Sequence, residues 1–271
     1  MKVLSIGTLK GGTGKSRTAE NLAAALALAG RKVLEVDFDL QGDVTVALGV
    51  AAPRNATIGD VLLTRLDADH PGPRALQDIR LDRTDLLGEN PHGGQLHLIP
   101  SVRLPMSRAE TAMKDNPGIG TKLLANLLRD VAHEYDYALI DNKPDLGILH
   151  SAALEAADAV LGIMTADTAP LRGGLSLRQT VEHFREAGGN LEFLGVLLNM
   201  WEEKEEADWV LSELTKQNVE ILATRIPRSK LVSKCFALGK PVVLQFPNSD
   251  VTDLYFQAAK EVIDKMRKEA V

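Results

Sequence analysis

The chain has 271 residues, 45% of them hydrophobic, and a formal net charge of -6 at pH 7. This composition supports a sizeable core and argues against a protein that coats nucleic acid over its whole surface. The single cysteine excludes a disulfide framework and any intrachain metal or redox site made of paired cysteines. No secretory leader or membrane-length apolar run is visible, so we expect one cytoplasmic α/β domain over residues 1–271.

A glycine-rich loop, Lys-Gly-Gly-Thr-Gly-Lys-Ser at 10–16, follows an apolar run at 3–6 and precedes an alanine-rich helical pattern at 19–29. Strand, glycine loop and helix in this order are typical of phosphate binding, because backbone N–H groups and the positive helix end converge on one anion. Lys15 is placed to reach the β- and γ-phosphates, and the Ser16 hydroxyl to ligate Mg²⁺. A plain glycine turn is the alternative.

The loop departs from the usual G-x-x-x-x-G-K-[ST] pattern, because Leu9 replaces the first glycine and Lys10 follows it. The form K-G-G-x-G-K-[ST] resembles the deviant Walker A motif of the ParA/MinD family of partitioning and positioning ATPases. In that family the early lysine reaches across a dimer interface to the partner's nucleotide, a role that falls on Lys10 here. The alternative is a solvated loop lysine. The predicted ATP-binding residues of this stretch are Lys10, Gly11, Gly12, Thr13, Gly14, Lys15, Ser16 and Arg17.

The run 32–36 predicts a second buried strand, which ends in the sequence D-F-D-L-Q-G at 37–42. Two carboxylates one residue apart at a strand's end project near the phosphates. The run resembles the family's D-x-D-P-Q-G segment, with Leu40 in place of proline. The resemblance assigns Asp39 to orienting or activating the attacking water and Asp37 to the magnesium surroundings. Alternatively, both acids cap the next helix.

A strand at 135–141 ends in Asp141, the pattern of a Walker B strand whose terminal aspartate holds magnesium. The next residues depart from the family's D-T-P-P-S-L-G, because the chain reads D-N-K-P-D-L-G at 141–147. The letters N-K-P-D also match the guanine-reading N-K-x-D motif of GTPases. They stand at the phosphate end of the nucleotide, so we interpret the match as coincidence. The replaced residues are candidates for altered contact with a dimer partner or regulator.

The remaining pattern continues the alternation of strands and helices. It predicts strands at 95–100, 159–164 and 194–199 and helices at 57–63, 123–133, 171–187 and 251–268. The fold class is therefore α/β, a doubly wound, mostly parallel sheet flanked by helices, with ligands at the carboxyl ends of the strands. Asn199 resembles a strand-end asparagine that serves adenine or nucleotide-loop recognition in the family.

The acidic stretch 202–208 would repel phosphates and predicts a solvated helix start. By contrast, 225–241 carries five cations and no acid. It resembles the family's I-P-R-x-…-G-K-P segment, which lies against the nucleotide base, with Pro227 and Ser229 as matching positions. Clustered cations suffice for DNA affinity without sequence choice. The DNA-binding candidates are Arg228, Lys230, Lys234 and Lys240. A plain surface helix is the alternative.

The last predicted helix carries a narrow apolar stripe, Leu254, Ala258, Val262 and Met266, which favours packing on the domain over docking on a membrane. The resemblance implies an ATP- and Mg²⁺-dependent homodimer switch with weak intrinsic hydrolysis, stimulated by a ParB-like adaptor. Such a protein segregates plasmid or chromosomal DNA or positions cargo on the nucleoid. Two alternatives stay open: a membrane-surface positioning ATPase and a metabolic enzyme that activates a small carboxylate with ATP.

Overall fold

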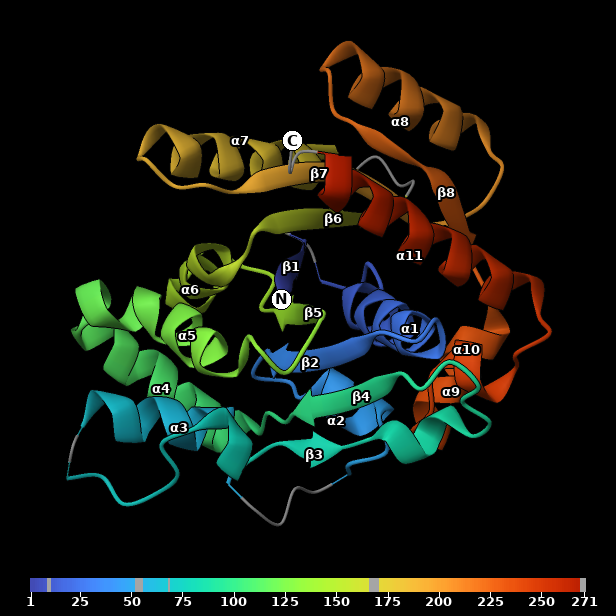
Figure 1. The fold of residues 1–271 in the computed structure, drawn as a ribbon. Helices are drawn as coiled ribbons and strands as arrows, with labels where there is room; N and C mark the ends of the chain where they lie inside the picture. Colours follow the sequence, from blue (N-terminus) through green and yellow to red (C-terminus); the bar gives the residue numbers. More distant parts are fainter. Residues whose placement is uncertain (9–10, 52–55, 68, 166–170, 269–271) are drawn as a thin grey trace.

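The structure is a computed structural model that describes residues 1–8, 11–51, 56–67, 69–165 and 171–268. An eight-stranded sheet runs through this described part in the order β3-β4-β2-β5-β1-β6-β7-β8, and only the pair β3–β4 is antiparallel (Figure 1). The strands are β1 (Lys2–Gly7), β2 (Lys32–Phe38), β3 (Leu81–Asp82), β4 (Gln95–Ile99), β5 (Tyr137–Asn142), β6 (Ala159–Thr165), β7 (Glu192–Trp201) and β8 (Ile221–Pro227).

Helices cover both faces of the sheet, and each face has its own apolar core (Figure 1). One face carries α1 (Lys15–Leu28), α2 (Asp43–Ala47), α9 (Lys230–Leu238), α10 (Val242–Gln245) and α11 (Asp250–Lys268). The other carries α3 (Ile58–Leu66), α4 (Arg103–Asp115), α5 (Pro117–Val131), α6 (Ile148–Ala156), α7 (Leu171–Glu186) and α8 (Glu205–Lys216). Because the central strands are covered twice, β5 and β6 are buried along their whole length.

Two helices show how the sequence fixes these layers. The alanines of α1 let it lie close to the sheet, and most of its residues are buried. In α5, Pro117 stands in the first turn, where its missing N–H costs nothing, and apolar residues recur on one face from Leu123 to Val131. The confirmed fold class places the carboxyl ends of β1, β2, β5 and β7 at one edge, and β1 lies where the strand order reverses. That edge is where such folds bind ligands.

The sequence-based elements agree with the structure apart from a few residues at their ends. Prediction missed β3, α4, α6, β8 and α10. In α4, the buried hydrophobic residues are only Met106, Ala109 and Met113, whereas Leu104 is exposed and most of the other residues are charged or polar. The apolar stripe of α11 lies in the core formed with α1, as expected, with Ala258, Val262 and Met266 buried. Across the described ranges, every helix is too short or too polar to cross a membrane.

Candidate functional site

The glycine loop joins β1 to α1 and is fastened from β7. Asn199, near the end of β7, donates from Nδ2 to the Thr13 carbonyl oxygen at 2.8 Å. Gly14 has a φ of 80°, and a Cβ there would come within 2.2 Å of the same Asn199 nitrogen. Gly14 also caps α1 without bringing a side chain to the helix's first N–H groups, which are the donors that bind anions at helix ends. The strand-end asparagine therefore positions the loop.

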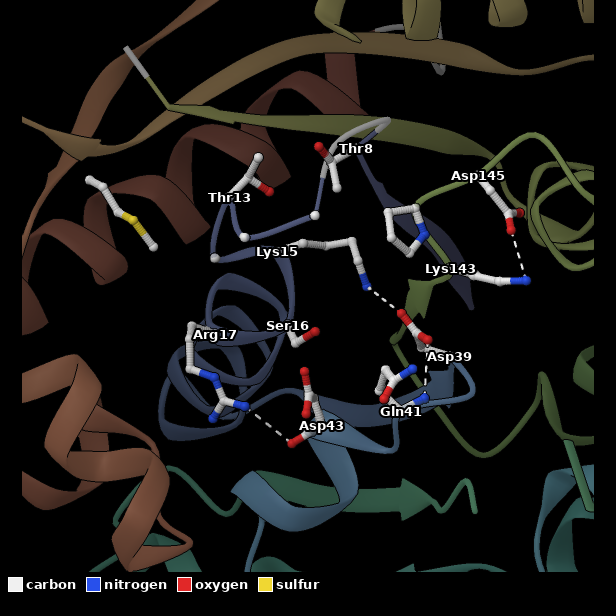
Figure 2. A pocket seen from close by; sticks show the side chains of 15 residues that line it. Thr8, Thr13, Lys15, Ser16, Arg17, Asp39, Gln41, Asp43, Lys143 and Asp145 are labelled. Carbon is white, nitrogen blue, oxygen red and sulfur yellow. Dashed lines mark hydrogen bonds and ion pairs between the residues drawn. The ribbon is translucent and has the colours of Figure 1, made fainter. Parts of the chain in front are cut away.

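A cavity of about 470 Å³ opens over this loop at the carboxyl edge of the sheet (Figure 2). Its lining residues are Thr8, Gly11, Gly12, Thr13, Gly14, Lys15, Ser16, Arg17, Asp39, Gln41, Asp43, Lys143, Pro144, Asp145 and Met200. The loop, the acid after β2 and the segment after β5 thus face one space, although they lie far apart in the sequence. Lys10 lies outside the described residues.

Lys15 and Ser16 both contact Asp141 at the floor of this site. The Lys15 Nζ lies 2.5 Å from Asp141 Oδ1 and 3.6 Å from Asp39 Oδ2, and Figure 2 shows the ammonium pointing at Asp39. The Ser16 hydroxyl donates to Asp141 Oδ2 at 2.7 Å. The side chains of Lys15, Asp39 and Asp141 are all nearly or fully buried. A phosphate that binds here would attract the Lys15 ammonium away from Asp39 and Asp141. Asp141 and Ser16 would then remain together as oxygen ligands for Mg²⁺.

The acids beneath the loop favour a cation. Burial raises the pKa of Asp141 above its usual value, against the lowering effect of Lys15 and Ser16. Burial, with the charge of Asp141 second, raises the pKa of Asp37 to about 7, and hydrogen bonds from Thr45 oppose this. A divalent ion would offset this mutual repulsion and displace the protons. Among the described residues, no three His, Cys, Asp or Glu side chains form a group that could hold a metal ion by themselves.

Asp37 and Asp39 occupy different surroundings. Asp37 Oδ2 accepts from the Thr45 N–H at 2.8 Å and from the Thr45 hydroxyl at 2.6 Å, so it caps α2, the alternative that the sequence left open. It is fully buried and its role near magnesium stays a prediction. Asp39 lines the cavity, and its Oδ1 accepts from the Gln41 N–H at 3.1 Å. Its carboxylate is thereby oriented beside Lys15, where the predicted work on an attacking water would take place.

Arg17 links the phosphate side to a second cavity of about 80 Å³. Its guanidinium lies 2.9 Å from Glu20 Oε2, donates to the Asp43 carbonyl oxygen at 3.2 Å and stands 4.1 Å from the centre of the Phe236 ring. This second cavity is lined by Gly14, Arg17, Asn199, Met200, Pro227, Arg228, Ser229, Val232 and Ser233. The fold thus brings the predicted residues Asn199, Pro227 and Ser229 beside the loop. Ser229 also caps α9.

The four DNA-binding candidates do not share one environment. Lys230 and Lys234 are exposed and one turn apart on α9, and Lys240 is half-buried beyond that helix. The Arg228 Nε donates to Glu202 Oε1 at 2.7 Å. The positive charge of Arg228 is thus offset by an acid of the stretch 202–208. Two exposed cations on α9 therefore remain as the strongest part of the predicted patch.

Sequence reasoning did not assign Gln41, Asp43 or Lys143 to the site, although all three line the cavity. Lys143 follows directly after β5 and Asp145 two residues later, so their place in the chain was a usable signal. The partner of Lys143 on α4, Glu110, had no such signal, because 33 residues separate the two.

The fold and this loop define a P-loop nucleotide-binding protein. The family model described as AAA domain matches residues 1–193. The chain is 32% identical to the chromosome partitioning protein ParA of Myxococcus xanthus, over 97% of this chain and 88% of that protein. It is 31% identical to the sporulation initiation inhibitor protein Soj of Bacillus subtilis, over 96% of this chain and 98% of that protein. The chain therefore belongs to the ParA/MinD family of partition and positioning ATPases, as its glycine loop predicted.

Solved structures confirm the fold. Apo McdA of Cyanothece superposes with a TM-score of 0.80 at 22% identity, over 97% of this chain and 99% of that chain. MinD of Pyrococcus horikoshii, solved with Mg-ADP, gives 0.77 at 24% identity, over 99% and 98%. Cobyrinic acid a,c-diamide synthase of Mycobacterium smegmatis, solved with ADP and magnesium, gives 0.78 at 23% identity, over 100% and 97%. At these identities the likeness speaks for the fold, which positioning proteins and a biosynthetic enzyme share.

Proposed function

We propose that this protein is an ATP-driven dimer switch that partitions plasmid or chromosomal DNA or positions cargo on the nucleoid. The observation that carries the proposal is the contact of Lys15 and Ser16 with Asp141 under the glycine loop. It joins the two halves of a nucleotide and magnesium site in a chain whose relatives are named for chromosome partitioning. The proposal extends to a cytoplasmic, nucleoid-associated location.

Each step of ATP hydrolysis has a candidate residue in the site. The N–H groups of the loop and of the start of α1 bind the phosphates, and Lys15 exchanges Asp141 for the β- and γ-phosphate oxygens. Ser16 and Asp141 hold Mg²⁺, which offsets charge on the phosphates when bound. Asp39, oriented by the Gln41 N–H, positions the attacking water. The chain needs only to hold and orient these groups, because phosphoryl transfer depends on positioning and electrostatics.

Dimerisation would complete the site. We assign to Lys10 the delivery of an ammonium to the partner's triphosphate, where it compensates negative charge in an interface from which water is excluded. A site that lacks this cation until two subunits meet hydrolyses ATP slowly by itself, which fits control by a ParB-like adaptor. The exposed Lys230 and Lys234 on α9 would supply contacts to DNA phosphates without sequence choice.

The two alternative functions lack a comparable observation. The apolar stripe of α11 is packed against the domain and is not available for docking on a membrane. The likeness to the diamide synthase is one of fold at 23% identity. A membrane-surface positioning ATPase should sediment with liposomes in the presence of ATP. A carboxylate-activating enzyme should turn over ATP only when a small carboxylic acid is present.

The decisive experiment measures the solution mass by light scattering with Mg²⁺ and a slowly hydrolysed ATP analogue. The wild-type protein should double its mass, and Lys10→Ala should bind the analogue but keep the mass of one chain. Lys32→Ala is the matched control, because Lys32 is exposed at the amino end of β2, away from the cavity, and this variant should dimerise. A wild-type protein that binds the analogue and stays monomeric would overturn the switch.

A further inference from the structure

Lys143 is a cation of the cavity wall that the proposed steps of hydrolysis do not use. The register of β2 with β5 pairs Asp37 with Asp141 and Phe38 with Asn142, so the next residues, Asp39 and Lys143, leave the same edge of the sheet side by side. Both line the cavity, and Figure 2 shows them on the same side of it, across from the glycine loop. Lys143 therefore lies beside Asp39, the acid that we assign to positioning the attacking water.

Two carboxylates hold Lys143 in this structure. Its Nζ lies 2.8 Å from Asp145 Oδ2, and 3.1 and 3.4 Å from the two carboxylate oxygens of Glu110 on α4. Glu110 is nearly buried and also receives Lys114, at 3.0 Å. Lys114 is mostly exposed and does not line the cavity. Glu110 thus contacts one lysine inside the site and one outside it.

The charges around the cavity make this arrangement responsive to a third phosphate. Asp39, Asp43 and Asp145 line it, so a nucleotide meets an acidic wall on that side. Of the lining cations that the structure describes, Arg17 forms an ion pair with Glu20, and Lys15, at the end of the glycine loop, forms one with Asp141. A terminal phosphate next to Asp39 would be repelled by this wall. Lys15 compensates part of that charge, and the flexible Lys143 side chain is a second neighbouring cation that can move toward the phosphate.

We propose that Lys143 contacts the terminal phosphate of a bound nucleoside triphosphate in its own subunit and so distinguishes a triphosphate from a diphosphate. Its ammonium exchanges Glu110 for a phosphate oxygen, and Glu110 keeps Lys114. The inference rests on the proposed function, because it requires a triphosphate on the glycine loop. It also connects the nucleotide to α4, since the presence of the third phosphate decides whether Glu110 holds the segment after β5.

The test compares affinities for ATPγS and for ADP, both with Mg²⁺, by titration calorimetry. It is done in the Lys10→Ala background, so that dimerisation does not enter the comparison. The preference for ATPγS over ADP should fall about tenfold in Lys143→Met, as expected for loss of a charge-assisted contact. Lys114→Met, which removes the other lysine from the same carboxylate, should keep the preference. Glu110→Gln should raise the preference, because it weakens the bond that competes with the phosphate.

The opposite signs expected for Lys143→Met and Glu110→Gln separate phosphate contact from mere support of the loop. If the pair only braces the segment after β5, both variants should change the preference in the same direction or leave it unchanged, and the inference is then wrong. Lys143→Arg should retain the preference, which tests the charge in a variant that keeps the ion pair. If the Lys10→Ala protein without further changes binds neither nucleotide, the proposed function itself fails. If it binds them but Lys143→Met and Lys114→Met show equal preferences, only the inference about Lys143 fails.

Discussion

The phosphate side of the site and the surface of α9 are built in opposite ways. On the phosphate side, Lys15 contacts both Asp39 and Asp141, and all three side chains are nearly or fully buried, so each charge depends on its neighbours. On α9, Lys230 and Lys234 are exposed, and the Lys234 ammonium stands 5.7 Å from the centre of the Phe246 ring. Buried charges are strongly coupled and costly to leave unpaired, whereas exposed charges act almost independently and are screened by salt. Substitutions should therefore be large and non-additive on the first side, small and additive on the second.

The largest effect is expected at Asp141. Asp141→Asn removes the charge that faces Lys15 and leaves one acceptor oxygen where Lys15 and Ser16 now use two, so Mg²⁺-dependent hydrolysis should fall by roughly a thousandfold, as for loss of a key electrostatic group. Asp136→Asn is the control, because Asp136 is exposed and directly precedes β5 at the opposite end from Asp141, and this variant should hydrolyse ATP normally. Steady-state phosphate release at saturating ATP measures both. Hydrolysis by Asp141→Asn at the control's rate would contradict the assigned magnesium role.

The next effect tests the coupling between the loop and β7. Gly14→Ala places a Cβ against Asn199 and forces a φ of 80° on a residue with a side chain, so nucleotide affinity should drop roughly a hundredfold. Asn199→Ala loses the bond to the Thr13 carbonyl and should weaken binding less. In the double variant the clash is gone, so its loss should be smaller than the sum of the single losses. The affinities for ADP are measured by calorimetry. If the losses of binding free energy in the two single variants add up to the loss in the double variant, the contact between the loop and Asn199 does not affect nucleotide binding.

The same contrast explains what the sequence could predict. Lys15, Ser16 and Asp141 were found although 125 residues separate Ser16 from Asp141, because both ends of the contact carry local patterns and parallel strands bring those patterns to one edge. Asn199 was named from the family resemblance, and the structure shows that its side chain donates to the Thr13 carbonyl oxygen of the loop.

Long-range side-chain contacts without a local pattern were not predictable. The stacking of Arg17 on Phe236 joins α1 to α9, and the bond of Lys143 to Glu110 joins the segment after β5 to α4. Neither contact follows from periodicity or motif, since each depends on how elements far apart in the sequence pack together. Asp37 shows a third kind of limit, because a strand-end acid suits a magnesium site and a helix cap equally well, and here it caps α2.

On the exposed side, Lys230→Gln with Lys234→Gln should weaken retention on nonspecific DNA about tenfold and reduce the slope of log affinity against log salt by about two. ATP binding should not change, because neither residue lines either cavity. The matched control removes two exposed lysines elsewhere, Lys122 on α5 and Lys260 on α11. Equal retention by the two double variants in filter binding with ATP would remove α9 from the DNA interface.

The smallest effect on function, and a gain in stability, is expected at Glu35 under the phosphate side. Glu35 is fully buried on β2 beside Leu98 and Leu139, and within the described part of the chain neither carboxylate oxygen has a hydrogen-bond partner. Burial first, and then the charges of Asp141 and Asp37, raise the pKa of Glu35 well above 4.5. It is a buried acid that no step of the proposed chemistry uses.

Because the folded state keeps this proton and the unfolded state releases it near pH 4.5, the contribution of Glu35 to stability is present below that pH. It is lost progressively as the pH rises toward the raised folded value. Glu35→Met should therefore increase the free energy of unfolding by about 1–3 kcal/mol at pH 8 and by less at pH 5. Urea unfolding at both pH values measures this, with the exposed Glu89→Met as control. An equal gain at both pH values would mean that packing, and not the buried charge, governs this position.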